Sequence, residues 1–229
     1  MPATTKTNSA VTLEQLKARE DVRAFIARAD HNMELIGYTE HGFRHADIVA
    51  ARASRILAAL CHDPRQAELA AIAGYLHDVG NVASRLSHPQ IGAAIAYQVL
   101  HEMGMPPEEL AEVLAGVANH EEDFGDPFGP VASAVIIADK SDVDRSRVRR
   151  SVPESQHDAH DRINYAAIQN ALEVDADERV IALKLSIATE IGSIMAYFEL
   201  FLSRMVISRR AAEMLGCKFA LVINDTRLA

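Results

Sequence analysis

Four of the ten histidines stand at or near the predicted ends of helices, and two aspartates accompany them. The six residues are His45, His77, Asp78, His88, His120 and Asp139. Residues at helix ends can converge on one point while the helices themselves form a rigid frame. Imidazole and carboxylate groups held in fixed directions, with a position left open for water, are the ligands that metal catalysis needs. We therefore predict a metal site built from these six side chains.

The six candidate ligands contain no soft sulfur donor, which limits the choice of metal. Nitrogen and oxygen donors of this kind suit Mn, Fe, Zn, Co and, less well, Mg. In the adjacent pair His77-Asp78, both side chains can turn toward one site, and the two Asp78 oxygens can bridge ions roughly 3.5–4 Å apart. Water between such ions becomes hydroxide near neutral pH and can attack phosphorus in line. The prediction is a site for two divalent ions.

Composition and charge narrow the class of protein. The 229 residues carry 23 basic and 32 acidic side chains, a formal charge of −9, which argues against binding of a nucleic-acid polymer. Two cysteines, Cys61 and Cys217, give neither a disulfide framework nor a cysteine-rich zinc site. The N-terminus lacks a signal pattern, and no apolar stretch approaches the roughly 20 residues of a membrane span. We expect a cytoplasmic protein without a membrane partner.

Apolar periodicity predicts a helical domain over residues 12–150, after a small, polar and disordered segment at 1–11. A first helix starts at a capping box of Thr12 with Gln15. The second helix is expected at about 44–60, and the third from Asp63-Pro64 to near Gly80. A fourth helix begins at Pro89, a fifth ends at about residue 120, and a sixth covers about 131–144. With 49% apolar residues and no Trp, these helices must pack closely through aliphatic side chains.

The pattern changes after a linker predicted at residues 151–160, and residues 161–229 predict a small α/β subdomain. Residues 180–187 alternate between apolar and polar positions, which is typical of a half-buried strand, and 163–174 is a weaker partner strand. Thr189 is expected to cap a long amphipathic helix that closes at Gly216, and 219–223 forms a last strand. The predicted fold class is thus mainly α, a helical bundle followed by a β-β-α-β appendage.

Five segments together resemble, in their usual order, the HD-domain superfamily of metal-dependent phosphohydrolases. They read GFRHADIVAARASRIL, AAIAGYLHDVGN, SHPQIGAAIA, VANHEEDFG and VIIADKSD, within about residues 35–150. The resemblance implies an HD-type helical bundle. It makes His45, His77, Asp78 and Asp139 the ligands of a first metal ion. His88 and His120 resemble the extra ligands of the two-metal branch, in which Asp78 would bridge.

Some positions depart from particular branches of that family. Cyclic dinucleotide phosphodiesterases often carry lysine at the position of Asn81, histidine at the position of Asn119, and a Gly-Tyr-Pro signature where this chain has the loop DFGDPFG. Cleavage of cyclic dinucleotides is therefore disfavoured. The branch of dinucleoside polyphosphate hydrolases shares with this chain the HPxxG pattern and the alanine-aspartate-lysine sequence. His41, one helical turn before His45, is either a third-metal ligand or a surface residue.

Other polar residues are candidates for handling the substrate. Arg44, Asn81, Arg145 and Arg147 are predicted to bind it, since cations neutralise the outer oxygens of a phosphate. The alternative for the basic run after Asp139 is a solvated helix end that interacts with the helix dipole. Lys140 and Glu121 are the candidate general acids that protonate the leaving group.

The predicted function is hydrolysis of a phosphate ester of a nucleotide or another small phosphorylated metabolite by metal-bound hydroxide. Two alternatives from other classes stay open. Some HD proteins use the same ligand cage as di-iron oxygenases, and a non-catalytic nucleotide-binding regulatory module would bind without turnover. The C-terminal subdomain is interpreted as a packing or homodimerisation element, or as a lid over the site.

Overall fold

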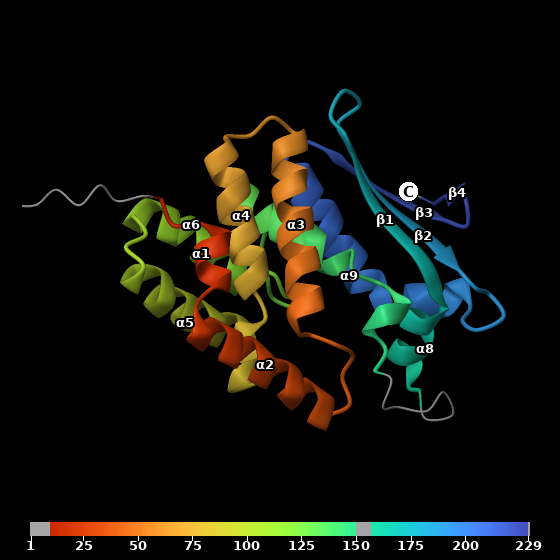
Figure 1. Ribbon diagram of the computed structural model, residues 1–229. Helices are drawn as coiled ribbons and strands as arrows, with labels where there is room; N and C mark the ends of the chain where they lie inside the picture. Colours follow the sequence, from red (N-terminus) through yellow and green to blue (C-terminus); the bar gives the residue numbers. More distant parts are fainter. Residues whose placement is uncertain (1–9, 150–156, 229) are drawn as a thin grey trace, which may run out of the picture.

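The computed structural model describes residues 10–149 and 157–228, and its larger part is a bundle of helices (Figure 1). The elements of this part are α1 (Leu13–Lys17), α2 (Glu20–Leu35), α3 (Phe43–Ala59), α4 (Pro64–Leu76), the 3-10 turn η1 (Val79–Val82), α5 (His88–Glu102), α6 (Pro107–Ala118), α7 (Gly129–Lys140) and the 3-10 turn η2 (Arg145–Arg147). Helix α7 lies at the centre, where it contacts α3, α4 and α6, and every residue from Val131 to Lys140 is buried.

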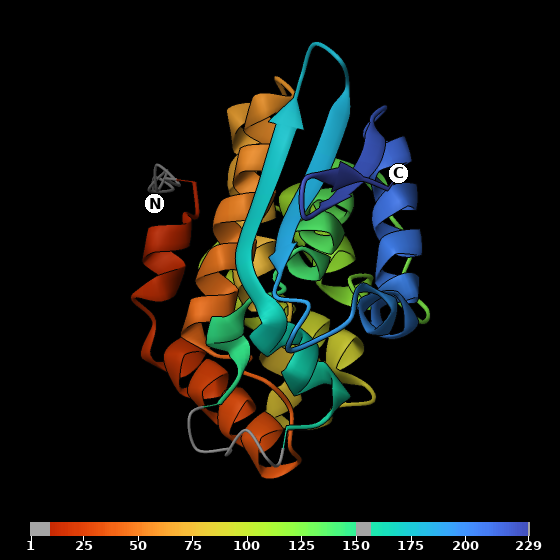
Figure 2. The same ribbon diagram turned by 90° about the vertical axis from the view of Figure 1, so that its right-hand side faces the viewer.

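The C-terminal part adds a helix, a sheet and a long helix. Its elements are α8 (Ala159–Ala166), β1 (Ala167–Asp175), β2 (Val180–Ile187), α9 (Ile194–Met214), β3 (Lys218–Ile223) and β4 (Thr226–Arg227). The sheet has the order β1-β2-β3-β4, in which β2 and β3 are parallel and the two outer pairings are antiparallel. Helix α9 makes the crossover from β2 to β3. The sheet lies to one side of the bundle in Figure 1 and in front of it in Figure 2.

The two parts share one hydrophobic core. Helix α9 packs against α7, and the buried apolar cluster runs from Val11 in the bundle to Ile223 in the sheet. No helix within the described ranges is both long and apolar enough to cross a membrane.

Small residues bring the chain segments of the site close together. A Cβ atom on Gly80 would lie 2.0 Å from the carbonyl oxygen of His88 and 2.5 Å from the nitrogen of Gly92. Only glycine therefore allows η1 to touch the first turn of α5. This contact places the end of α4 and the start of α5 side by side.

The predicted fold class is confirmed, with several shifted boundaries. In β2 the alternation holds, since Ile181, Leu183, Leu185 and Ile187 are all buried. The first helix is divided into α1 and α2. The capping box of Thr12 with Gln15 is present.

Two boundary predictions in the C-terminal part are wrong. Residues 163–166 belong to α8 and not to a strand, because Asp158 and Asp161 form a capping box that starts a helix there. Thr189 does not cap α9. Ser193 does, and its side chain accepts a hydrogen bond from the Ala196 nitrogen at 3.0 Å.

Parts of the predicted disordered and linker segments lie outside the described residues, at 1–9 and 150–156. In the remainder of the linker, residues 159–160 already belong to α8.

Candidate metal centre

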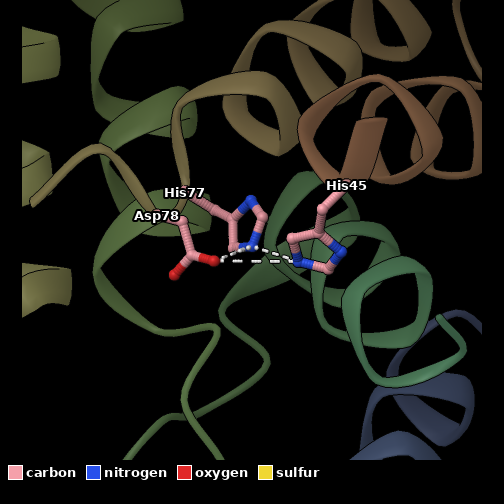
Figure 3. Close-up of side chains that lie close together, drawn as sticks. All are labelled: His45, His77 and Asp78. Carbon is pink, nitrogen blue, oxygen red and sulfur yellow. Dashed lines mark hydrogen bonds and ion pairs between the residues drawn. The ribbon is translucent and has the colours of Figure 1, made fainter. Parts of the chain in front are cut away.

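The six predicted ligands converge from the ends of five helical elements. His45 lies in the first turn of α3, His77 and Asp78 follow α4, and His88 is the first residue of α5. His120 lies just after α6, and Asp139 lies in the last turn of α7. The four histidines are about 1% exposed, so their rings are held inside the protein. Figure 3 shows His45 and the His77-Asp78 pair pointing toward one another.

The ligand atoms form two groups on either side of Asp78. The Nε2 atoms of His45 and His77 lie 3.2 Å apart, and those of His88 and His120 lie 2.9 Å apart. Asp78 Oδ2 is 3.7 and 3.3 Å from the first pair, and Asp78 Oδ1 is 3.4 and 3.8 Å from the second. Each oxygen of this carboxylate thus faces one histidine pair.

Asp139 belongs to the first group. Its Oδ1 lies 3.3 Å from His45 Nε2 and 3.8 Å from His77 Nε2. Three sets of ligand atoms each lie within 4.8 Å of one another. The sets come from His45, His77 and Asp78, from His77, His120 and Asp139, and from Asp78, His88 and His120. These buried groups could each hold a metal ion.

The other ring nitrogen of each histidine fixes the tautomer. All four Nδ1 atoms lie 2.7 Å from an oxygen atom. For His45 this oxygen belongs to the Asp142 carboxylate. For the other three it is a main-chain carbonyl oxygen: Gly74 for His77, Arg85 for His88 and Val117 for His120. A carbonyl or an ionised carboxylate only accepts hydrogen bonds, so each Nδ1 carries the proton and each Nε2 directs a lone pair inward. Lone pairs that face each other at about 3 Å repel unless a cation or a proton lies between them. The donor set therefore fits a metal ion.

The charges in the cluster also favour a bound cation. Burial opposes ionisation of Asp78, but the surrounding histidines, His77 first, hold the pKa of this carboxyl well below its usual range. Burial also works against a proton on His77, but the carboxylates of Asp78 and Asp139 outweigh it and raise the pKa of His77 to about 9. A bound cation would take the place of that proton.

Asp142 contacts the cluster, but it was not among the residues predicted from the sequence. Its side chain is 1% exposed, and its Oδ2 lies 2.7 Å from His45 Nδ1 and 2.9 Å from an Arg44 nitrogen. Burial opposes ionisation, but the His45 hydrogen bond and the neighbouring arginines hold the pKa of Asp142 far below its usual range. Its position three residues after Asp139, one turn further along the chain, is the signal that could have found it.

The four predicted substrate ligands have partners within the protein. Arg44 pairs with Glu40 at 2.9 Å as well as with Asp142, and Asn81 donates to the Asp78 carboxylate at 2.9 Å. Arg145 donates to the Tyr165 carbonyl at 2.7 Å. Their binding of substrate stays a prediction.

Arg147, the fourth, is 3% exposed and donates to the carbonyls of Asp142 and Glu40. Among these four residues, it is the one whose side chain also lines the cavity beside the cluster. Arg149 pairs with Asp30 at 2.7 Å.

The two candidate general acids lie in one buried ion network. Lys140 Nζ is 2.9 Å from Asp139 Oδ2 and also pairs with Glu122. Burial disfavours the ammonium, but the carboxylates of Asp139, Glu122 and Glu121 raise the pKa of Lys140 above its usual value. Glu121 Oε2 lies 3.5 Å from His88 Nε2, and burial raises the pKa of this carboxyl. Of the two, Glu121 is therefore the better proton donor and Lys140 the fixed positive charge.

A cavity of about 430 Å³ opens beside the cluster. Its lining includes His41, Arg85 and Glu121, each next to a predicted metal ligand. The guanidinium of Arg85 lies 3.2 Å from Glu121 and 5.3 Å from the centre of the Tyr38 ring. Arg85 was not among the predicted residues, because an arginine in a loop carries no motif. His41 lines the cavity and is half-buried, which differs from a residue on the open surface.

Part of the chain is similar to known proteins. The family model of the HD domain matches residues 40–144, a span that contains all six predicted ligands. The uncharacterized protein MJ1020 of Methanocaldococcus jannaschii is 27% identical over 180 residues, which cover 69% of this chain and 68% of that protein. A predicted HD superfamily hydrolase from an uncultured Thermotogales bacterium aligns with a TM-score of 0.45 and 22% identity, over 67% of this chain and 89% of that chain. Residues 40–144 are thus similar to the HD domain, as the motifs of this span predict.

Proposed function

We propose that this protein is a metal-dependent hydrolase that cleaves the phosphate ester of a small phosphorylated metabolite. The observation that carries the proposal is the inward convergence of four histidine Nε2 atoms around the two oxygens of Asp78. Such a set of ligands suits two divalent ions, with His45, His77 and Asp139 on one side of Asp78 and His88 and His120 on the other. Mn, Fe, Zn, Co or Mg could fill it.

Divalent ions bound at such a centre supply an activated water and a positive charge for the phosphate oxygens. The protein's own residues do the remaining work. Asp142 and the three main-chain carbonyls hold the imidazoles in one orientation. Lys140 keeps a fixed positive charge beside Asp139, and Arg85 presents a guanidinium at the cavity. Such preorganised charges stabilise the developing negative charge on a transferring phosphoryl group.

Glu121 is positioned to protonate the leaving oxygen. Its side chain is 10% exposed, lines the cavity and lies within 4 Å of His88, Arg85 and Lys140. Because burial raises the pKa of this carboxyl, a proton can be kept on it closer to neutral pH than on an exposed glutamate.

The size of the cavity supports a small substrate, since about 430 Å³ lies within the usual range of pockets for small molecules. A nucleotide or a sugar phosphate fits this class.

The proposal is tested by metal analysis of the purified protein together with a phosphate-release screen. The screen covers monophosphates, diphosphates and dinucleotides in the presence of each candidate metal. Asp78→Ala is expected to lose bound metal and to release phosphate at the background rate. Asp47→Ala serves as a matched control, because Asp47 is an exposed aspartate of α3 whose side chain pairs with Lys17. Full turnover by Asp78→Ala, or absence of phosphate release with every metal and substrate, would contradict the proposal.

A further inference from the structure

The outward side of α9 carries a regular stripe of exposed residues. They recur four and three residues apart in turn, which is the spacing of the contact seam in a coiled coil. The stripe consists of six residues, all of them exposed: Met195, Glu199, Leu202, Val206, Arg209 and Glu213. Since an α-helix turns by about 100° per residue, the cavity residue Arg204 lies on the opposite side of α9, together with buried residues such as Tyr197 and Ala211. The stripe is therefore separate from the metal centre.

The middle of the stripe is apolar. Leu202 is 60% exposed and Val206 is 43% exposed, and both line a shallow groove of about 180 Å³. The other apolar residues along this groove come from α9, from β3 and from the end of the described chain: Phe198, Met205, Phe219, Leu221 and Leu228. Contiguous apolar side chains that stay exposed in a single chain are typical of an interaction surface.

Opposite charges flank this apolar centre at equal distances along the helix. Leu202 and Val206 lie two residues to either side of Arg204, and Glu199 and Arg209 lie five residues to either side. When a second α9 runs antiparallel, with Arg204 of both copies at one height, Leu202 of each copy faces Val206 of the other. In the same pairing, Glu199 of each copy faces Arg209 of the other.

Parallel pairing in register does not match these charges. It places each side chain opposite its own copy, so that Glu199 meets Glu199 and Arg209 meets Arg209. Like charges that face each other across an interface are destabilising. The order of charges along the stripe therefore favours the antiparallel arrangement.

We propose that the exposed face of α9 binds a second copy of this chain in an antiparallel, two-fold symmetric pair. The same patch contributes from both copies, so the contact closes as a dimer and does not continue into a filament. Arg209, which lies 3.9 Å from Glu213 of its own chain, then also meets Glu199 of the second copy. The metal centre of each copy stays complete, because Arg204 and the cavity lie on the other side of the helix.

Sedimentation velocity of the 229-residue chain over a range of protein concentrations tests the proposal, and we expect a dimer for the wild type. Leu202→Glu introduces an unpaired carboxylate at the apolar centre. We expect the dissociation constant of the dimer to rise more than about 30-fold, the effect of a central interface residue. Leu35→Glu is the matched control, because Leu35 at the end of α2 is 68% exposed and lies outside the stripe.

Charge reversal tests the orientation of the two helices. Glu199→Arg brings two positive side chains together on each flank, and Arg209→Glu brings two negative ones together. Each change alone should raise the dissociation constant about tenfold, since two ion pairs become two repulsive contacts. Both changes in one chain restore opposite charges, and the constant should return to within about threefold of the wild-type value.

A wild type that is monomeric at every concentration would overturn the proposal. A dimer that Leu202→Glu leaves unchanged, or that Leu35→Glu dissociates equally, would place the contact elsewhere and overturn it too. A double charge-reversal variant that dissociates as readily as the single variants would overturn the antiparallel arrangement.

Discussion

The two walls of the cavity are organised in different ways. At the metal centre, His77, His88 and His120 each donate Nδ1–H to the carbonyl of the residue three positions earlier. Their orientation is thus set within one turn of their own chain. In another part of the lining, Asn164 and Arg204 come from α8 and α9, which reach the cavity through the packing of the C-terminal part on the bundle.

We expect this difference to separate the chemistry from the choice of substrate. Ligand directions that depend on local backbone survive changes elsewhere in the fold. A wall that depends on tertiary packing can change with α8 and α9 while the metal centre stays the same. Variants on the metal side should therefore abolish activity with every substrate, and variants on the other side should change the preference among substrates.

The largest effect is expected for Asp139→Asn. Asp139 completes the group of His45 and His77, and an amide in its place removes a negative charge and a strong metal ligand. We expect kcat to fall more than about 100-fold for every substrate, which exceeds the usual effect of groups that only orient ligands. Steady-state kinetics with saturating metal measure it, with Asp47→Asn as control. A change in preference without loss of kcat would contradict the division between the two walls.

A smaller effect is expected for Asp142→Asn. This carboxylate orients His45 through Nδ1, and an amide holds the ring less firmly and without charge. We expect the affinity for the ion on the His45 side to fall about 10–100-fold. Competition with a chelator of known affinity measures the change. Equal affinity in wild type and variant would show that His45 is oriented by its packing alone.

Lys140→Met tests the fixed positive charge. The ammonium pairs with Asp139 and Glu122, and the raised pKa keeps it charged throughout the neutral range. We expect kcat to fall about 10–100-fold while bound metal is retained, because a fixed positive charge beside Asp139 is removed. The exposed Lys184, which pairs with Glu173 on the sheet, gives the control Lys184→Met. Loss of metal together with activity would show that Lys140 instead holds Asp139 in place.

The smallest effect is expected for Arg204→Gln on the C-terminal side. Arg204 pairs with Glu122 at 3.1 Å, and both side chains are partly exposed. Such pairs contribute at most about 1 kcal/mol, so kcat/KM should fall no more than about fivefold. Arg209→Gln on the same helix is the control, since Arg209 is 65% exposed and pairs only weakly with Glu213. A loss as large as that of Asp139→Asn would place Arg204 in the catalytic machinery.

The sequence predicted the metal centre better than it predicted the cavity. Histidines and aspartates at the ends of helices are visible as a pattern, and the structure brings all six together. Asn164 and Arg85 could not be predicted, because a single amide or guanidinium has no signature until the fold shows which cavity it lines.

Local signals also explain the boundary errors of the C-terminal part. Residues 163–166 alternate like a strand, but the capping box of Asp158 and Asp161 makes them helical. Thr189 resembles a helix cap. Gly192, where a Cβ would lie 3.0 Å from the Ala166 Cβ, instead lets the turn approach α8 and delays the helix to Ser193.

We propose that Asp78, together with two histidine pairs, would hold two metal ions. Metal stoichiometry measured by mass spectrometry on purified wild type and on His88→Ala and Asp78→Ala tests this proposal. We predict about two ions per chain in wild type, about one in His88→Ala and none in Asp78→Ala. The same stoichiometry in wild type and His88→Ala would contradict it.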